Sequence, residues 1–309
     1  MKTINPAPRI VAIGGTTASG KTAMAIKLAM QFNAEIVSAD SLQLYRLLDI
    51  GSAKPTPHER TLVHHHLIDC LEIDEGFSAA DYLTHAARAI DNITSRGKRA
   101  IVVGGTGLYL KALLKGLIPA PAGNDEMRQG YRNIANIHGV AHLHGLLSAK
   151  DPTSAATIFP QDLQRIIRAL ETLELTGRSI TKIREEHRFA DSRYPALLLA
   201  LSLPREELFC RIELRVEQML AAGFLEEVRG ILARGYPSSL KPLRAVGYKQ
   251  MIAHLSGDLS LMEAQREMKQ ETKHYSKRQL TWFKHQLAME WFPANSYKEI
   301  VQRVAEFWQ

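Results

Sequence analysis

Short apolar runs alternate with amphipathic stretches in the first third of the chain. Ile10–Ile13 contains no polar residue, a glycine-rich segment follows it, and Lys21–Gln31 then has apolar residues at helical spacing. Two further strand-like runs follow, Glu35–Ser38 and Ala100–Val103, with a helical pattern around Asp81–Ser95 between them. Strands that alternate with helices are typical of a parallel sheet covered on both faces. The pattern therefore predicts an α/β fold.

The strand pattern stops near Pro119. A Pro-Ala-Pro-Ala-Gly sequence begins there, and both Asp125–Leu147 and Asp162–Leu175 then have the periodicity of helices. Gly177 is a plausible end for the second of these helices, because glycine is common just after a helix. The middle of the chain is therefore predicted to be helical.

The strand pattern resumes after Tyr194 with the apolar run Pro-Ala-Leu-Leu-Leu-Ala-Leu-Ser-Leu. Helices are predicted beyond it over Arg205–Ala221, Phe224–Arg234 and Leu261–Lys284. The expected organisation is an α/β core formed by residues 1–119 and 195–309, with a helical insertion domain at residues 120–194.

Composition excludes several classes of protein. The 309 residues are 45% hydrophobic and 23% charged, which is typical of a globular protein and excludes disorder over most of the chain. No apolar run approaches the roughly 20 residues that span a bilayer, and the first residues lack the pattern of a secretory signal. The two cysteines, Cys70 and Cys210, exclude a disulfide framework and a four-cysteine zinc site. We expect a cytoplasmic protein without a membrane partner. Its net charge of +7 is compatible with binding to an anionic partner.

One segment matches the phosphate-loop motif G-x-x-x-x-G-K-[ST] completely, between a predicted strand and a predicted helix. It consists of Gly15, Thr16, Thr17, Ala18, Ser19, Gly20, Lys21 and Thr22. Glycines let successive backbone N–H groups point at an anion, and the helix N-terminus adds a positive end. Lys21 supplies a full charge, and the Thr22 hydroxyl can hold Mg²⁺. We therefore expect a P-loop NTPase-like sheet that binds a diphosphate or triphosphate, with Mg²⁺ as cofactor.

The aspartate that P-loop ATPases carry after a later strand is missing from its usual place. The strand Ala100–Val103 is followed by Gly-Gly-Thr-Gly, whereas Glu35–Ser38 is followed by Ala-Asp-Ser. The carboxyl ends of parallel strands converge on one crevice, so Asp40 and Thr106 should both face the bound phosphates. Asp40 could hold Mg²⁺, accept a proton from a nucleophile or cap a helix, and Thr106 could cap the helix that follows it.

Blocks of sequence along most of the chain carry a further signal. They are Ile36–Arg46, Asp49–Pro55, His65–Asp69, Phe77–Asp81, Gly104–Tyr109, Lys111–Leu114, Asp162 with Gln164–Glu171, Arg244–Tyr248 and Lys277–Trp282. In this order they resemble the bacterial tRNA dimethylallyltransferases, also called tRNA isopentenyltransferases, from about Ile10 to Trp282. The family usually has proline where this chain has Thr16, His64 and Leu163, and often threonine at Ser52. The zinc finger of eukaryotic relatives is missing.

The resemblance implies a prenyl transfer. A dimethylallyl group would move from dimethylallyl diphosphate to the exocyclic amine of the adenosine at position 37 of tRNA, next to the anticodon, giving isopentenyladenosine. The phosphate loop would then bind the diphosphate of the donor rather than ATP. The implied partners are dimethylallyl diphosphate and the anticodon stem-loop of tRNA, and we expect a monomer.

The resemblance also implies roles for individual residues. Asp40 is the expected base that accepts the proton of the amine. Lys21, the loop N–H groups and an arginine would stabilise the departing diphosphate, and Arg244 is a candidate for that arginine or for a contact to a tRNA phosphate. Thr106 is expected to hydrogen-bond the donor phosphate or the target base.

The resemblance further implies that residues in several segments of the chain contact tRNA. The candidates are Asp40, Ser41, Leu42, Gln43, Thr106, Arg128, Gln164, Arg165, Ile166, Ile167, Arg168, Arg244, Gly247, Tyr248, Lys249, Lys277, Arg278 and Trp282. Gln43 could read a base beside the target. The stretch Thr272–Lys284 contains four basic residues, no acid and interleaved aromatic residues, which suits phosphate contacts and base stacking. A solvated basic face with aromatic core positions is the other interpretation.

Other functions remain open from the sequence. A prenyltransferase that acts on free adenine nucleotides would need neither the helical insertion nor the basic stretch. A P-loop small-molecule kinase would need ATP turnover, and an RNA-binding module would leave the phosphate loop unexplained. The run His64–His66 permits a metal site, but we interpret it as a source of structural polar contacts, because consecutive residues seldom bind one ion without distant ligands.

Overall fold

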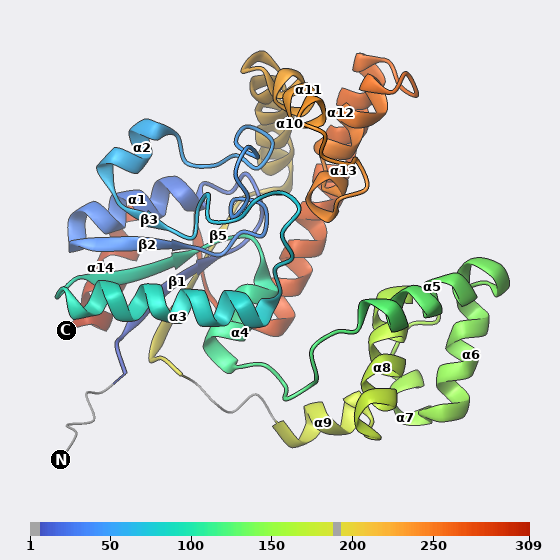
Figure 1. Cartoon of the computed structure of the whole chain (residues 1–309). Coiled ribbons are helices and arrows are strands. Elements are labelled where there is room, and N and C mark those ends of the chain that lie inside the picture. The colour runs from blue at the N-terminus through green and yellow to red at the C-terminus, as the bar shows by residue number, and fades with distance from the viewer. Residues whose placement is uncertain (1–6, 188–192) are drawn as a thin grey trace. The chain divides into compact units, whose positions relative to one another are not determined.

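The computed structural model describes residues 7–187 and 193–309. Its six strands form one parallel sheet in the order β3-β2-β4-β1-β5-β6 (Figure 1). The strands are β1 (Ile10–Gly14), β2 (Ala34–Ser38), β3 (His65–His66), β4 (Arg99–Val103), β5 (Ala196–Ser202) and β6 (Glu290–Pro293). The predicted α/β fold with a parallel sheet is confirmed. The sequence pattern missed only the short edge strands β3 and β6.

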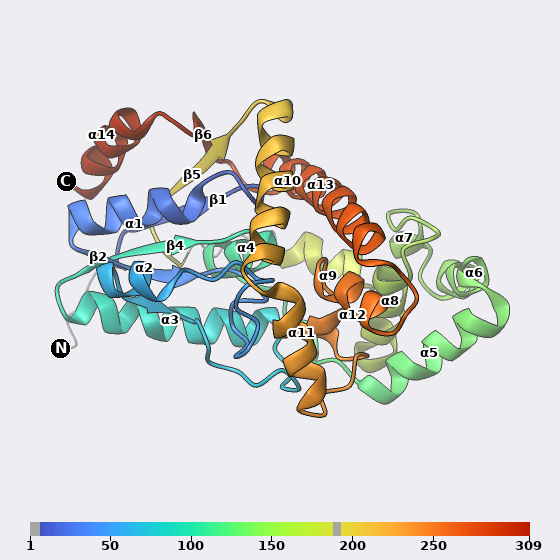
Figure 2. The same ribbon diagram turned by 90° about the horizontal axis from the view of Figure 1, so that it is seen from above.

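Helices cover both faces of the sheet, as Figure 2 shows. Val11 and Ile13 of β1 face helices α1 (Lys21–Phe32) and α14 (Tyr297–Trp308). Ile10 and Ala12 of the same strand face the other core, which includes α3 (Ala79–Ser95) and α4 (Gly107–Lys115). Because alternate side chains of a strand point to opposite faces, an apolar run without polar residues is what a strand buried on both faces requires.

A second group of helices packs beyond the carboxyl ends of the strands. It comprises α10 (Arg205–Ala221), α11 (Phe224–Ala233), the 3₁₀ helix η1 (Lys241–Arg244), α12 (Tyr248–Leu255) and α13 (Leu261–Gln286). The short helix α2 (Pro57–Leu62) lies beside α1 instead. The longest helix of the group, α13, has Ser260 as its N-cap, with a reciprocal hydrogen bond from Glu263. Its far end places Phe283 in the core against the sheet. Among the described residues, no helix combines the length and apolarity needed to span a membrane.

The insertion forms a compact unit of its own. One unit takes in Met1–Leu114 and Arg193–Gln309, and the other takes in Lys115–Ser192, so the first boundary lies before residue 115 rather than after residue 119. Its helices are α5 (Asp125–His138), α6 (Val140–Lys150), α7 (Pro152–Ala155), α8 (Leu163–Thr176) and α9 (Ile180–His187).

One predicted helix of the insertion is wrong. The segment expected to run from Asp125 to Leu147 is divided by Gly139, whose φ of 86° is incompatible with a continuous right-handed helix. Helix α8 agrees with the prediction, because the Asp162 side chain accepts from Arg165 N and Gly177 ends the helix with a φ of 68°.

Candidate active site

The phosphate loop connects β1 to α1 and curls around an open centre. Gly15, Ala18 and Gly20 have φ values of 128°, 61° and 90°, so three of its residues adopt backbone conformations that favour glycine. The Ser19 hydroxyl donates to the carbonyl of Thr16 at 2.9 Å, and the Lys21 ammonium donates to the same carbonyl. The loop is therefore held in shape by its own side chains.

Lys21 is partly buried in this loop, and no carboxylate among the described residues forms a salt bridge with it. Burial is the main cause that lowers the pKa of Lys21 to about 7, the positive charge of Arg215 lowers it further, and Asp40 opposes both. Because two positive groups share a desolvated site, an anion bound there would restore the full charge on Lys21. The electrostatics of the loop are therefore those of a site for a phosphate group.

Asp40 lies at the end of β2, beside the phosphate loop. One of its carboxylate oxygens, Oδ1, accepts a hydrogen bond from Leu42 N at 2.9 Å, which closes a turn rather than starting a helix. The helix-cap alternative for Asp40 is therefore not realised. At the same edge Ala39 N donates to Val103 O at 2.8 Å, so the ends of β2 and β4 are joined.

Thr106 links the two strand ends through its side chain. Its Oγ1 accepts from Ser41 N at 3.0 Å and donates to Ser41 Oγ at 3.3 Å, while its own N–H donates to Ala39 O at 3.1 Å. The hydroxyl therefore braces the turn that carries Asp40 instead of capping α4. Thr106 is not among the residues that line the two cavities described next.

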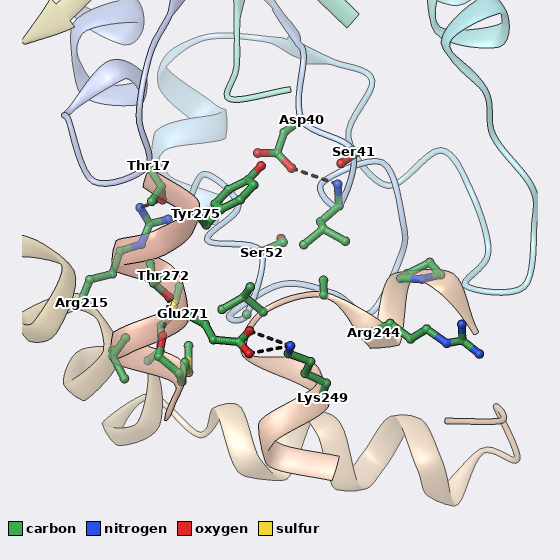
Figure 3. Close-up of a pocket in the computed structure, with 18 of the residues that line it drawn as sticks. Thr17, Asp40, Ser41, Ser52, Arg215, Arg244, Lys249, Glu271, Thr272 and Tyr275 are labelled. Carbon is green, nitrogen blue, oxygen red and sulfur yellow. Dashed lines mark hydrogen bonds and ion pairs between the residues drawn. The ribbon is translucent and has the colours of Figure 1, made fainter. Parts of the chain in front are cut away.

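Two cavities meet at Asp40. One, of about 570 Å³, contains the phosphate-loop residues Lys21 and Thr22. The other, of about 490 Å³, has a mixed lining, in which Leu42, Phe77 and Tyr109 stand beside charged side chains. Figure 3 shows three of the charged ones, Arg244, Lys249 and Glu271. Both are lined by Thr17, Ala18, Asp40, Ser52, Arg215 and Tyr275. The carboxylate of Asp40 thus lies between the cavity that contains the phosphate loop and a second cavity whose lining includes aromatic side chains.

Arg215 and Tyr275 reach this junction from α10 and α13. Arg215 Nη1 donates to Thr17 Oγ1 at 3.3 Å, which directs a partly buried guanidinium at the phosphate loop. Desolvation, with a contribution from Asp40, raises the pKa of Tyr275 to about 12, so its hydroxyl stays a hydrogen-bond donor. Figure 3 shows Arg244 extended away from the Arg215 side of the cavity. Of the two arginines, Arg215 is the one in contact with the phosphate loop.

Comparison with known proteins decides the family. The IPP transferase family model matches residues 43–286. The chain is 48% identical to tRNA dimethylallyltransferase 2 of Syntrophus aciditrophicus, over 97% of this chain and 96% of that protein. It belongs to the tRNA dimethylallyltransferase family. A second relative at 48% identity is the tRNA dimethylallyltransferase of Geobacter metallireducens, which covers 92% of each chain.

Solved structures of the family have the same fold. The tRNA isopentenylpyrophosphate transferase of Bacillus halodurans is 36% identical and superposes with a TM-score of 0.73, over 97% of this chain and 96% of that one. A eukaryotic dimethylallyltransferase solved while acting on tRNA is 26% identical and superposes with a TM-score of 0.78, over 97% of this chain and 77% of that one. The resemblance seen in the sequence is therefore confirmed at the level of the family and its fold.

In the α/β unit, the residues expected to contact tRNA differ in their exposure to solvent. Arg244, Lys249, Lys277 and Arg278 are exposed, although Lys249 forms an ion pair with Glu271 at 2.7 Å. Ser41, Leu42, Gln43 and Trp282 are partly buried, whereas Gly247 and Tyr248 are buried. Arg244, Lys277 and Arg278 therefore remain available to an anionic partner, whereas Lys249 is paired with Glu271.

Tyr248 has a structural role in this arrangement. It is fully buried, and its hydroxyl donates to Glu227 Oε1 at 2.8 Å. Glu227 also accepts from the backbone N–H groups of Ile50, at 2.6 Å, and Gly51, at 3.2 Å. The pair thereby fixes the turn that leads to Ser52, which lines both cavities.

The candidate tRNA-contacting residues of the insertion also differ in their exposure to solvent. Gln164 and Arg165 are exposed on α8, whereas Ile166 and Ile167 are buried in the core of the insertion. Arg128 and Arg168 are ion-paired with the fully buried Glu171, with Arg128 Nε 2.8 Å from its Oε1. Because breaking a buried ion pair leaves an uncompensated charge, both arginines are needed to compensate the charge of Glu171 in the core of the insertion.

Sequence reasoning missed three residues that the structure brings to the site: Arg215, Gln279 and Glu227. Each reaches the loops from a helix far along the chain. Gln279 lies within the block Lys277–Trp282 that resembles the family, but the sequence assigned it no role. The only available signal for Arg215 was its spacing of four residues from Arg211, which puts both side chains on one face of α10.

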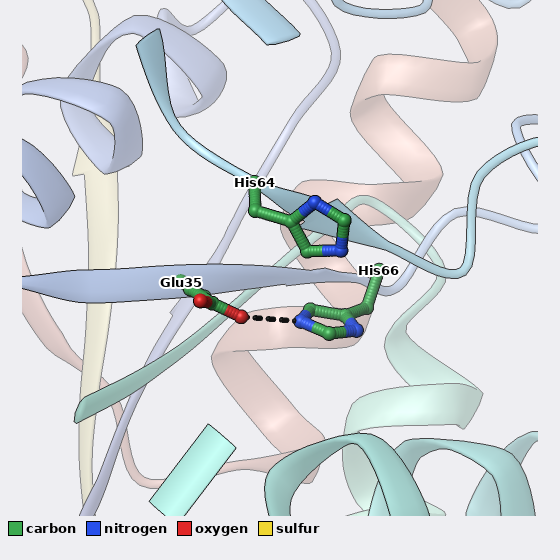
Figure 4. A group of neighbouring side chains, drawn as sticks. All are labelled: Glu35, His64 and His66. Carbon is green, nitrogen blue, oxygen red and sulfur yellow. Dashed lines mark hydrogen bonds and ion pairs between the residues drawn. The ribbon is translucent and has the colours of Figure 1, made fainter. Parts of the chain in front are cut away.

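The histidine run forms polar contacts beside the β2–β3 edge. Glu35, His64 and His66 lie close enough to share a metal ion, with His66 Nε2 2.7 Å from Glu35 Oε2 (Figure 4). However, both oxygens of the buried Glu35 carboxylate are also bonded by Arg96, at 2.6 Å, and Oε1 by Lys98, at 2.8 Å. Hydrogen bonds from these cations hold the pKa of Glu35 well below its usual range. The carboxylate is thus neutralised by the protein itself, and we propose no metal there.

Proposed function

We propose that this chain transfers the dimethylallyl group of dimethylallyl diphosphate to the exocyclic amine of adenosine 37 in tRNA, next to the anticodon. The observation that carries the proposal is the junction of two cavities at Asp40, one lined by the phosphate loop and the other by a mixture of aromatic, apolar and charged side chains. A diphosphate in the first and a base in the second would bring the donor carbon and the acceptor amine to the same carboxylate. Family membership supports the same reaction.

In the first cavity, the chain would bind the donor by its charge. Lys21 and Arg215 both line this cavity, and their attraction to the departing diphosphate would strengthen as negative charge develops on it. Hydroxyl and carboxylate oxygens are the ligands that Mg²⁺ prefers, and Thr22 lines this cavity. Mg²⁺ held by Thr22 and the donor phosphates would neutralise charge on the leaving group.

At the junction, Asp40 would act as the base. The amine nitrogen forms a bond to C1 of the dimethylallyl group, the bond from C1 to the diphosphate oxygen breaks with its electron pair, and a proton moves from the amine to the Asp40 carboxylate. An adenine amine is a weak nucleophile, so a positioned proton acceptor accelerates its attack. Thr106 would act indirectly, since its hydroxyl braces Ser41 beside Asp40.

The second cavity would receive the adenine, turned out of the stack of the anticodon loop. Its aromatic residues offer faces for a base, and Gln43, at the turn after Asp40, is the candidate reader of a neighbouring base. Lys277, Arg278, Arg244, Gln164 and Arg165 are the exposed side chains proposed to contact tRNA. One chain supplies every group that we assign to the reaction, so we propose that the protein acts as a monomer. We also propose that it acts in the cytoplasm, where tRNA is found.

The choice of acceptor tests the proposal. Labelled dimethylallyl diphosphate, Mg²⁺ and the protein are incubated with unmodified tRNA or with adenine nucleotides, and label on each acceptor is counted. Transfer to tRNA alone is the expected result. Transfer to the nucleotides but not to tRNA would favour a free-nucleotide prenyltransferase. ATP hydrolysis without any prenyl transfer would favour a kinase-like activity.

Donor affinity should fall as the pH rises above 7. Free Lys21 has a pKa of about 7, and a bound diphosphate raises it, so binding takes up a proton at higher pH. The Kd should therefore increase by up to about tenfold per pH unit above pH 7. Lys21→Arg keeps the charge without titrating in this range and should bind with a flat pH profile. Calorimetry of donor binding at several pH values gives both profiles, and a flat profile in the unmodified protein would contradict the prediction.

Affinity for tRNA should fall steeply with salt, because lysine and arginine contacts release counterions from phosphates. Lys277→Ala and Arg278→Ala should each reduce the slope of log affinity against log salt concentration by about one. Donor affinity should hardly change in either variant. Filter binding or anisotropy at several salt concentrations measures the slope. Slopes equal to that of the unmodified protein would remove these residues from the tRNA surface.

A further inference from the structure

Helix α13 lies against three glycines at the carboxyl ends of β1 and β4. A Cβ on Gly14 would come within 2.6 Å of Phe283, one on Gly105 within 2.5 Å of Gln279, and one on Gly107 within 2.2 Å of Trp282. A side chain at any of the three positions would therefore force its neighbour on α13 to shift. The helix that carries Lys277 and Arg278 is therefore seated directly on the loops that follow both central strands.

Gln279 is the polar residue of this contact, and both ends of its amide are used. Its Oε1 accepts from Thr17 N at 2.8 Å, and its Nε2 donates to Gly105 O at 3.0 Å. The side chain is buried, with 7% of the residue exposed. A buried amide bonded at both ends has one position, because any shift would leave a polar group unsatisfied.

The two bonded backbone groups belong to two different loops, both of which line the cavity that contains the phosphate loop. Thr17 precedes Ala18, which has a φ of 61° and persists in that conformation only if its surroundings hold it. Gly105 precedes Thr106, whose hydroxyl accepts from Ser41 N beside Asp40. One amide group thus spans the loop that would hold the diphosphate and the loop that braces the proposed base.

We propose that Gln279 is a positioning residue that fixes the distance between the donor diphosphate and Asp40. The proposal rests on the proposed function, since it assigns the phosphate loop to the donor and Asp40 to the acceptor. Gln279 lines the phosphate cavity, but both ends of its amide are bonded to the backbone, so the proposal gives it no hydrogen bond to the donor. It would act by holding the phosphate loop and Asp40 at a fixed distance from each other. A misplacement of about 1 Å between reacting groups can lower the rate by about 10²-fold.

Gln279→Met keeps the length of the side chain and removes both hydrogen bonds. We expect it to lower the single-turnover rate by about 10- to 100-fold and to weaken the binding of dimethylallyl diphosphate measured without tRNA. Affinity for tRNA should stay unchanged, since Lys277 and Arg278 are intact. Gln270→Met, at an exposed position of the same helix, is the matched control and should leave all three measurements unchanged.

Gly105→Ala provides an independent route to the same effect, because its Cβ would displace the Gln279 amide. Its rate loss should match that of Gln279→Met, and the double variant should lose little more than either single one, which is the sign of a shared mechanism. Additive losses in the double variant would contradict the proposal. So would a Gln279→Met enzyme whose transfer rate and donor affinity are normal and whose melting temperature alone is reduced. An unmodified protein that transfers no prenyl group would instead overturn the proposed function.

Discussion

Asp40→Asn should lower the single-turnover rate of prenyl transfer by at least about 10²-fold, the usual contribution of a positioned base. Asparagine keeps the shape of the side chain and its oxygen can still accept from Leu42 N, so the turn after β2 should persist. It cannot take a proton from the amine. The rate is measured with saturating tRNA and donor, which separates the chemical step from binding.

The other roles of Asp40 predict different results. A Mg²⁺ ligand would show weaker donor binding, partly rescued by added Mg²⁺, and a residue that only closes a turn would show nearly normal activity in the Asn variant. Asp258→Asn changes an exposed aspartate that lines neither cavity and serves as the control. A rate for Asp40→Asn within a few-fold of the control would eliminate Asp40 as the base.

Lys21→Ala should lower the transfer rate by about 10²- to 10³-fold, the scale for loss of one preorganised electrostatic group. The lysine contributes most when the bond to the diphosphate is breaking, so the loss should appear in the chemical step as well as in donor affinity. Affinity for tRNA should be unaffected, because the basic side chains of α13 remain.

A second lysine of α1 provides the control for this variant. Lys27 is exposed on the same helix and lies over the Tyr297 ring, with its Nζ 5.6 Å from the ring centre. Lys27→Ala should therefore transfer the prenyl group at the normal rate. If Lys21→Ala were equally active, the assignment of the phosphate loop to the donor would fail.

Local chemistry explains which parts of the fold could be predicted from the sequence. The ends of α8 follow from Asp162 and Gly177 alone, and the phosphate loop follows from its spacing. The break at Gly139 was missed because apolar spacing continues across it. Histidine pairing in β3 was missed because a two-residue edge strand has no periodicity to detect.

The site was only partly predictable for a different reason. Asp40 and the phosphate loop are short segments with a recognisable order, so their convergence follows from the parallel sheet. Arg215 bonds a residue 198 positions away and Gln279 one that is 262 positions away, and no local pattern encodes such contacts. Tyr248 belongs to a block that resembles the family, but its complete burial was not visible from that block.

Mass spectrometry of the tRNA product tests the central claim most directly. Unmodified tRNA is incubated with the protein, dimethylallyl diphosphate and Mg²⁺, digested with a nuclease, and the fragments are sequenced by their masses. We predict one added dimethylallyl group on the fragment that contains adenosine 37, and none on a tRNA in which another base replaces that adenosine. An unchanged mass at adenosine 37, or prenyl groups at other positions, would contradict this account.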